Sequence, residues 1–386
     1  MRIRSRSRNR SAAAAFLAAA MTLALVACDA AAQDTSEKAA DSKTVAAARK
    51  SAQALVDKAS GATVFSKPAD AFDTGAARGR TVWVVTLDNS IPYVRAVLNG
   101  MTEAGRKAGV KVRVFDSKGS TSNAGKGVEQ ALATGAAAVV AFGINLSEVS
   151  GAVRSAQQAK VPVISAFNVD AHAPLEKGAA GAVSVDFHAS GRILAAHAVT
   201  ATDGPVHASY QHLPSVATFA ALKKGLQDGF KEFCRSGCSL SVDDLNQADF
   251  KQGAERVTSS TLMRNRKLNW VFPAIDGIAQ FTVPAIEAAN RPGTQASSIN
   301  AVAANLEFVR DGRVQSADIG NNNSWLGWAM MDRSLRAIAG QKPDTTVVPI
   351  KLFVKENLKG KDLTDEDALF DGAGYRDGFS ALWKTR

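Results

Sequence analysis

Hydrophobic runs alternate with amphipathic stretches along the chain from residue 81 onward. Residues 82–87 form a continuous β-branched and apolar run, which is typical of a strand buried on both faces of a parallel sheet. The next segment begins at Pro92 and repeats apolar residues at helical spacing as far as Gly109, which predicts an amphipathic helix. The pattern therefore opens with one strand and one crossover helix.

The same unit recurs through most of the chain. Strands separated by helices of this length require right-handed crossovers, and hence a parallel sheet. The expected strands are 82–87, 111–115, 137–142, 161–167, 182–185, 206–210, 239–245, 268–272 and 299–303. The expected helices between them are 122–134, 147–160, 188–202, 218–233, 250–265 and 276–289, and a late helix is expected over 325–340. We therefore expect an α/β fold with two doubly wound parallel-sheet lobes, in which ligands lie at the carboxyl ends of the strands.

The first 27 residues follow a different pattern. Residues 2–10 hold five arginines and no acid, and residues 11–26 form a short apolar run, which together indicate an export signal. The run ends in Leu25-Val26-Ala27-Cys28, which resembles the lipobox of bacterial lipoproteins. That resemblance implies cleavage before Cys28 and a lipid on its thiol, so that Cys28 anchors the protein to a membrane.

The signal also accounts for half of the basic charge. The whole chain carries a formal net charge of +10, with 46 Lys and Arg against 36 Asp and Glu. Residues 28–386 carry only +5, and no segment among them gathers Lys and Arg into a stripe. The sequence therefore argues against a nucleic-acid partner.

Residues 28–78 are polar, rich in alanine and mixed in charge, and we interpret them as a tether. Within them, Val45, Ala48, Ala52, Leu55 and Val56 recur at helical spacing. A helix over 44–58 that packs on the body is therefore the alternative.

The chain contains three cysteines, and two of them form the pair Cys234 and Cys238 where a helix is expected to end. In an oxidising compartment these two thiols are expected to join in a small disulfide that ties the helix to the following strand. A redox pair or half of a zinc site would need a shorter spacing or further ligands.

Motifs of the commonest enzymes are missing from the sequence. It contains neither G-x-S-x-G nor H-E-x-x-H, and its five histidines lack the spacing of a metal site. The glycine-rich stretch 119–127 has five residues between Gly119 and Gly125 and no Ser or Thr after Lys126, so it is not a phosphate loop. We expect no catalytic residue, metal or cofactor, although an exported α/β hydrolase remains an alternative.

The order of elements, together with residues 86–93, 112–117, 161–165 and 272–276, resembles that of type I periplasmic solute-binding proteins of the ribose- and galactose-binding kind. The resemblance implies a three-segment hinge, with crossings near Asp186, Gly320 and Pro349. It assigns residues 79–185 and 321–348 to the N-terminal lobe, and residues 186–320 and 349–386 to the C-terminal lobe.

The resemblance also implies a ligand site between the lobes. The positions that match ligand-binding residues of the family are Asn89, Tyr93, Phe167, Asn168, Phe250, Asp276, Asn305, Asn321 and Asn322. Where sugar binders carry arginine and several carboxylates, this chain has mostly amides and aromatic rings. Such a lining is suited to a small neutral ligand that is partly apolar.

These observations predict an extracytoplasmic, lipid-anchored, monomeric lipoprotein component of a bacterial ABC transporter. It would capture a small molecule by hinge closure and pass it to the permease of the importer. A receptor that reports its ligand to a membrane signalling protein shares the fold and the cleft, so the sequence leaves that alternative open.

Overall fold

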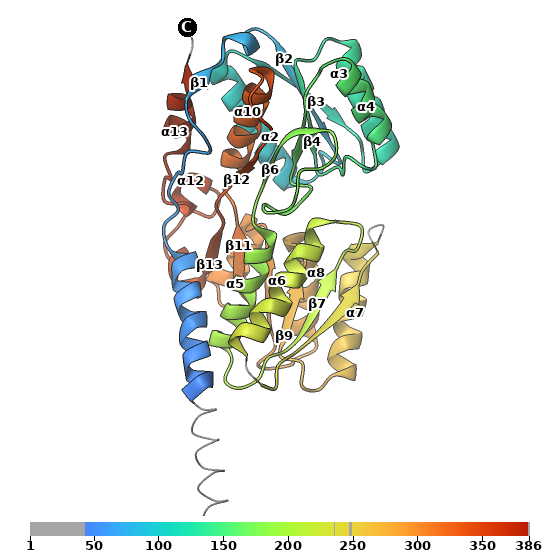
Figure 1. Ribbon diagram of the computed structural model, residues 1–386. Helices are drawn as coiled ribbons and strands as arrows, with labels where there is room; N and C mark the ends of the chain where they lie inside the picture. The colour runs from blue at the N-terminus through green and yellow to red at the C-terminus, as the bar shows by residue number, and fades with distance from the viewer. Residues whose placement is uncertain (1–42, 235, 247–248, 385–386) are drawn as a thin grey trace, which may run out of the picture.

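A computed structural model describes residues 43–234, 236–246 and 249–384 of the chain. They form two lobes, each built on a six-stranded sheet with helices on its faces (Figure 1). The predicted α/β class with two doubly wound lobes is thereby confirmed. The expected signal peptide and Cys28 lie outside the described residues.

The sheet of the N-terminal lobe is entirely parallel, with the strand order β12-β6-β5-β4-β2-β3. A parallel sheet needs cover on both faces, which explains the unbroken apolar sequence of its central strands. Its strands are β2 (Thr81–Thr86), β3 (Lys111–Asp116), β4 (Ala138–Phe142), β5 (Val163–Ala166), β6 (Ala179–Ser184) and β12 (Thr345–Val347).

Two helices of this lobe, α2 (Pro92–Ala108) and α10 (Asn323–Ile338), pack unusually close together. A Cβ on Gly100 would lie 2.5 Å from the backbone of Ser324, and a Cβ on Gly327 would lie 2.3 Å from the backbone nitrogen of Met101. Only glycine allows this approach of the two backbones. The remaining helices of the lobe are α3 (Thr121–Ala133) and α4 (Ser150–Gln158).

The sheet of the C-terminal lobe has the order β13-β11-β10-β9-β7-β8, with β13 antiparallel to β11 and the other neighbours parallel. Its strands are β7 (His207–His212), β8 (Ser239–Asp244), β9 (Trp270–Pro273), β10 (Gln295–Ile299), β11 (Gln315–Gly320) and β13 (Lys351–Val354). Its helices are α5 (Phe187–Ala201), α6 (Thr218–Phe233), α7 (Phe250–Arg264), α8 (Asp276–Ala288) and α9 (Ala303–Arg310).

The strand expected at 299–303 is wrong by four residues. The observed strand β10 is Gln295–Ile299, and α9 begins at Ala303. The apolar run after Ile299 cannot extend the strand, because Asn300 and Ala301 adopt positive φ angles of 114° and 50°. The true strand is rich in Ala and Ser, and its small side chains are nevertheless buried in the sheet.

The chain passes between the two sheets three times, after β6, after β11 and after β12. These passages bring the lobes together along one side of the molecule (Figure 1). The predicted three-segment hinge is therefore confirmed as part of the fold.

Residues 43–60 form a helix that packs on the C-terminal lobe, drawn in blue in Figure 1. Ala48, Ala52 and Val56 are buried, as the helical spacing in the sequence indicated. Arg49 donates hydrogen bonds of 2.9 and 3.1 Å to the carbonyl oxygens of Thr200 and Thr202, at the end of α5. Residues 43–60 of the expected tether therefore form a docked helix, as the alternative interpretation of 44–58 predicted.

Two terminal segments, residues 61–78 and 359–384, run beside the hinge and contact each other; we call them the terminal strap. They contain the short strands β1 (Phe72–Asp73) and β14 (Trp383–Lys384), which pair in parallel, and the helices α12 (Glu366–Leu369) and α13 (Tyr375–Leu382). The strap begins on the C-terminal lobe, where Asn357 of helix α11 (Lys355–Leu358) donates a hydrogen bond to the carbonyl oxygen of Ser60.

The strap ends on the N-terminal lobe. Trp383 stacks on Trp328 of α10 with ring centroids 5.4 Å apart, and Tyr375 stacks on Trp325 at 5.3 Å. Arg376 pairs with Glu103 of α2 at 2.8 Å. The expected placement of all of residues 349–386 in the C-terminal lobe is therefore corrected for α13 and β14, which pack on the N-terminal lobe.

Candidate functional site

The carboxyl ends of the strands of both sheets meet beside the hinge, where a small cavity lies between the lobes. Its volume is about 10 Å³, near the minimum for one water molecule. Aliphatic, aromatic, hydroxyl and amide groups line it: Phe167, Val185, Ser190, Ile299, Asn300, Ile319, Gly320, Asn321 and Ile350. No side chain in this lining is ionisable.

The wall of the N-terminal lobe is a cluster of aromatic rings. The ring of Phe167 lies 5.4 Å from that of Tyr93 and 4.9 Å from that of Phe187, between centroids. Phe142, at the end of β4, lies 6.3 Å from Tyr93 and 6.4 Å from Phe167. Phe167 has a positive φ of 63°, so the turn after β5 directs its ring into the cluster at some cost in backbone energy.

The hydroxyl group of Tyr93 is buried and finds no hydrogen-bond acceptor by distance and angle among the described residues. Burial raises the pKa of Tyr93 above its usual value, and the nearby side chain of Asn321 partly offsets this. A buried hydroxyl without a partner carries an energetic cost that a hydroxyl-bearing ligand would remove. Tyr93 and Asn321 therefore place two polar side chains next to each other beside the cavity.

Asn89 and Asn168 support the loops that carry this wall. The side-chain oxygen of Asn89 accepts a hydrogen bond from Thr86, at the end of β2. Asn168 donates bonds of 3.1 Å to the carbonyl oxygen of Ala141 and to the hydroxyl of Ser165. Its own side-chain oxygen is buried and has no partner among the described residues, which leaves one acceptor available.

Two of the expected residues of the C-terminal lobe lie near the start of α8. Phe250 is half-buried, and its ring edge lies against Gly277, 3.8 Å from where a Cβ on that glycine would stand. Asp276 is fully buried, accepts hydrogen bonds from the Ser298 hydroxyl and the Val302 backbone nitrogen, and does not line the cavity. Burial raises the pKa of Asp276 to about 6.

Asn305 does not face the space between the lobes. It lies in α9, fully buried, where it donates to Gln315 at 2.9 Å and accepts from Gln280 at 3.1 Å. The residue that follows β10 and lines the cavity is Asn300. Sequence reasoning missed Asn300 because it placed the strand four residues too late, and the signal that would have found it is the buried Ala-Ser-Ser-Ile run before it.

Asn321 and Asn322 follow β11, but the structure separates them. Asn321 lines the cavity, whereas the side-chain oxygen of Asn322 caps α10 by accepting from the backbone nitrogen of Trp325 at 2.9 Å. The amide nitrogen of Asn322 donates to Asp367 of the terminal strap at 3.2 Å. The side-chain oxygen and nitrogen of Asn322 thus both have partners, one in the helix and one in the strap.

A larger hollow of about 470 Å³ lies away from the strand ends, between α2, α10 and the strap. Its charged groups bind one another, since Arg376 pairs with Asp367 and Glu366 accepts from Asn323 and from the Ser324 backbone nitrogen. Burial raises the pKa of Glu366. We therefore regard this hollow as part of the strap contact.

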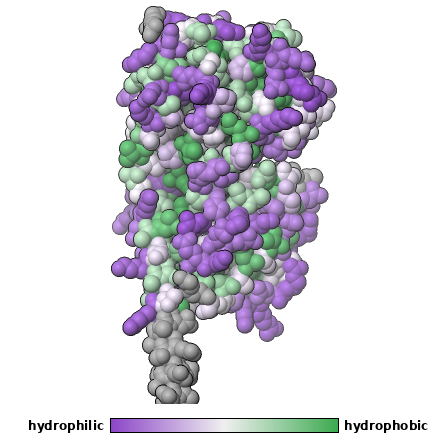
Figure 2. All heavy atoms as spheres, in the orientation of Figure 1, coloured by the Kyte–Doolittle hydropathy of each residue, from purple (hydrophilic) through white to green (hydrophobic). Residues whose placement is uncertain are grey.

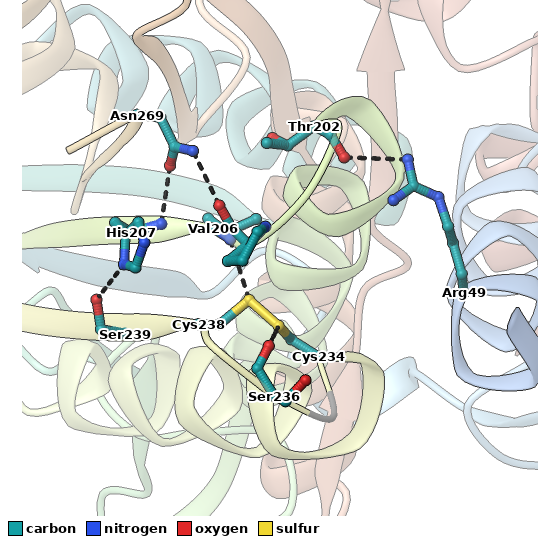
Figure 3. The surroundings of a disulfide bond; sticks show 10 residues. Arg49, Thr202, Val206, His207, Cys234, Ser236, Cys238, Ser239 and Asn269 are labelled. Carbon is teal, nitrogen blue, oxygen red and sulfur yellow. Dashed lines mark hydrogen bonds between the residues drawn. A yellow bond between two sulfur atoms is a disulfide. The ribbon is translucent and has the colours of Figure 1, made fainter. Parts of the chain in front are cut away.

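Cys234 and Cys238 lie at the end of α6 with their sulfur atoms 1.96 Å apart, within bonding distance (Figure 3). The sulfur of Cys238 also accepts a hydrogen bond from the backbone nitrogen of Val206, next to β7. This pair lies in the C-terminal lobe near Arg49 of the N-terminal helix and takes no part in the cavity.

Among the residues that the structure describes, no set of three or more His, Cys, Asp or Glu side chains is arranged to hold a metal ion. None of the helices described combines the length and the hydropathy needed to cross a bilayer. On the face shown in Figure 2, hydrophobic residues are scattered among hydrophilic ones over both lobes.

Solved structures with the same fold come from several bacteria. The periplasmic ribose ABC transporter protein of Conexibacter woesei is similar with a TM-score of 0.66 and 19% identity, over 78% of this chain and 98% of its own. A solute-binding protein of Actinobacillus succinogenes with bound D-allose has a TM-score of 0.64 and 20% identity, over 73% of this chain and 100% of its own. One of Bacillus halodurans with bound myo-inositol has a TM-score of 0.64 and 15% identity, over 76% of this chain and 99% of its own.

No curated protein matches the sequence closely enough to be counted as a relative. The model of the periplasmic binding protein domain matches residues 81–342, more than half of the chain. This range holds most of both sheets and all but one of the residues that line the cavity. Members of that family are non-enzymatic binding proteins, so the hydrolase alternative falls away. With this match, and with two parallel-sheet lobes around a hinge, the chain belongs to the periplasmic binding protein family and has the type I fold.

Proposed function

We propose that this protein is the solute-binding lipoprotein of a bacterial ABC importer and that it captures a small neutral solute between its lobes. The observation that carries the proposal is the lining of the cavity at the hinge, which contributes amides, a hydroxyl and apolar groups from both lobes and no ionisable side chain. A charged ligand would lose its hydration there without gaining a counter-charge, which is costly.

The unpartnered polar atoms support a ligand that bears hydroxyl groups. The hydroxyl of Tyr93 and the side-chain oxygen of Asn168 are both buried without partners. A polyol offers donors and acceptors to both, and the rings of Tyr93 and Phe167 offer apolar faces to its C–H surfaces. The neighbours named above include a ribose transporter protein and two proteins with bound D-allose and myo-inositol. Ribose, allose and inositol are all neutral polyhydroxyl compounds. The absence of arginine from this lining favours a ligand with more apolar surface than ribose.

Capture requires the lobes to separate. A volume of about 10 Å³ is far below the several hundred Å³ of typical ligand pockets, so a solute enters only when the hinge opens. Contacts to both lobes then stabilise the closed arrangement, which the permease recognises.

A thermal-shift screen tests the ligand class, because a compound that binds only the folded protein raises its melting temperature. We expect shifts with neutral sugars and polyols, with deoxy sugars and cyclitols ahead of ribose, and none with charged amino acids. Tyr93→Phe should reduce the shift, since it removes only the unpartnered hydroxyl. Tyr210→Phe is the matched control, because Tyr210 donates to the Phe219 carbonyl oxygen in the C-terminal lobe, away from the cavity. A response to charged solutes alone, or to none of these compounds, would contradict the proposal.

Membrane fractionation tests the anchor. The Leu25-Val26-Ala27-Cys28 sequence motivates the expectation that Cys28→Ser releases the protein from the membrane. If the variant stays in the membrane fraction as the unaltered protein does, the lipid anchor is wrong. Genes for a permease and an ATPase beside this one would favour import, whereas a kinase gene would favour a sensing receptor.

A further inference from the structure

The loop that carries Asn300 into the space between the lobes has a conformation that its own residues do not favour. Asn300 has a φ of 114° and Ala301 a φ of 50°, and neither is glycine. Such conformations are energetically unfavourable for residues other than glycine and persist only where the surroundings hold them in place. Contacts with other parts of the lobe must therefore hold this loop.

Two buried carboxyl groups bind the loop on its inner side. Asp276, at the first residue of α8, accepts a hydrogen bond of 2.8 Å from the backbone nitrogen of Val302. Asp318, in β11, accepts one of 3.1 Å from the backbone nitrogen of Ala301. Asp276 is 1% exposed and Asp318 is 0% exposed, so neither carboxyl is solvated by bulk water. The loop amides next to Asn300 are thus fixed from both sides.

The two carboxyl groups also lie close enough for each to affect the pKa of the other. The groups around them are neutral. The hydroxyl of Ser298 in β10 donates to Asp276, and Gln315 in β11 donates to Asp318 at 3.0 Å. Asn305 of α9 and Gln280 of α8 extend this network.

Charged and titratable groups on the neighbouring elements have partners of their own. Lys351 of β13 pairs with Asp371, and His197 of α5 bonds Ser316. Burial raises the pKa of Asp276 to about 6, and burial together with Asp276 raises the pKa of Asp318 well above its usual value.

Two buried carboxyl groups stabilise a fold poorly, because apolar residues would fill the same space without the energetic cost of burying ionisable groups. We infer that Asp276 and Asp318 are positioning residues of the inter-lobe site, which together hold the loop 300–302 so that Asn300 faces the bound solute. This inference rests on the proposed function, since it assigns a task to two residues that do not themselves reach the cavity.

Hydrogen exchange tests the positioning role without any ligand. Asp318→Leu removes the acceptor for the Ala301 amide, so the exchange rates of the Ala301 and Val302 amides should rise at least tenfold. Asp318→Asn keeps an acceptor for the Ala301 amide, so it should preserve the protection. Asp311 is an exposed carboxylate at the end of α9, so Asp311→Asn is the control and should leave both exchange rates unchanged. Equal protection in Asp318→Leu and the unaltered protein would overturn the inference, whether or not a sugar binds.

A double-mutant cycle on affinity then separates positioning from general stability. The probe is whichever of D-ribose, D-allose and myo-inositol gives the largest thermal shift, measured by calorimetry. Asn300→Gly removes the side chain and suits the positive φ, so it should weaken binding about tenfold without lowering the melting temperature. Asp318→Leu should weaken binding to a similar extent, and Asp318→Asn should restore it.

In the Asn300→Gly background, Asp318→Leu should weaken binding no further, because its effect passes through Asn300. Additive losses would mean that Asp318 acts on binding by another route and would overturn the inference. If none of the three probes binds, the proposed function fails, while the exchange experiment still decides the role of the carboxyl pair.

Discussion

The guanidinium group of Arg336 lies over the ring of Phe72, with its carbon 4.2 Å from the ring centroid. Arg336 belongs to α10 of the N-terminal lobe and Phe72 to β1 of the terminal strap. Arg336 also pairs with Asp332 at 2.8 Å and donates to the carbonyl oxygen of Asp70 at 2.9 Å. Both members of the ion pair are almost fully buried, so this contact joins the strap to the lobe through a desolvated charge.

Arg336→Met should lower the free energy of unfolding by about 3–5 kcal/mol, because it leaves the buried carboxylate of Asp332 without its partner. Urea denaturation measures the change. Arg336→Met combined with Asp332→Leu should recover part of the loss, since the unpaired charge is then gone. Lys67→Met is the control, because the Lys67–Asp70 pair is exposed and its removal should leave stability unchanged. A loss below about 1 kcal/mol in Arg336→Met would show that the buried ion pair contributes no more to stability than an exposed pair does.

Weakening the strap should widen the range over which the lobes open. Trp383 stacks on Trp328 and donates to Asp332 at 2.8 Å, so Trp383→Ala removes two contacts between the strap and α10. Spin labels on Glu129→Cys of α3 and Gln252→Cys of α7, in the mature chain carrying Cys28→Ser, report the distance between the lobes. We expect a broader distribution with longer distances in Trp383→Ala.

Val283→Ala is the matched control for this experiment, because it loosens the buried core of the C-terminal lobe without touching the strap. The same broadening in both variants would mean that lost stability alone opens the lobes. An unchanged distribution in Trp383→Ala would mean that the three hinge passages set the opening by themselves.

The Cys234–Cys238 pair predicts that the mature chain contains no free thiol. Titration under denaturing, non-reducing conditions should detect none in a Cys28→Ser protein. Replacing both cysteines by serine should cost about 2 kcal/mol, as expected for so short a loop. A thiol that titrates in the unreduced protein would rule out the bond.

The stability of the protein should decrease as the pH is lowered, because His197 is buried in its neutral form. Its ring packs against Trp270, and burial lowers the pKa of His197 to about 4, whereas an unfolded histidine titrates near 6.5. Between these pH values His197 binds a proton in the unfolded chain but not in the folded chain. Stability is therefore lost as the pH falls from about 6.5 to 4. Asp276 acts in the opposite sense over an overlapping range, because its pKa is raised to about 6 and its contribution is lost as pH rises.

Comparison with a variant isolates the histidine. Between pH 7 and about pH 4.5, His197→Gln should lose about 2 kcal/mol less stability than the unaltered protein. His172→Gln, at a position whose side chain is 73% exposed, should follow the unaltered protein. Identical pH profiles for His197→Gln and the unaltered protein would mean that His197 does not remain neutral in the fold.

Periodicity along the sequence determined the order and nature of most elements. The strand expected at 82–87 is observed at Thr81–Thr86, and the helix begins at Pro92 as predicted. Continuous apolar runs and helical spacing are properties of neighbouring residues, so the sequence alone reveals them. The closeness of Cys234 to Cys238 was predictable because the two residues are only four positions apart in the chain.

Only the tertiary structure decided which polar residues face the space between the lobes. Asn300, and not Asn305 as expected, follows β10 and lines the cavity. The reason is that β10 is a strand of small residues, which is stabilised by pairing with the neighbouring strands β9 and β11. Asn322 became a helix cap bound to Asp367, 45 residues away in the chain. The strap, the Arg336–Phe72 contact and the Asp276–Asp318 pair likewise join distant segments, and such contacts depend on packing in three dimensions that no local pattern encodes.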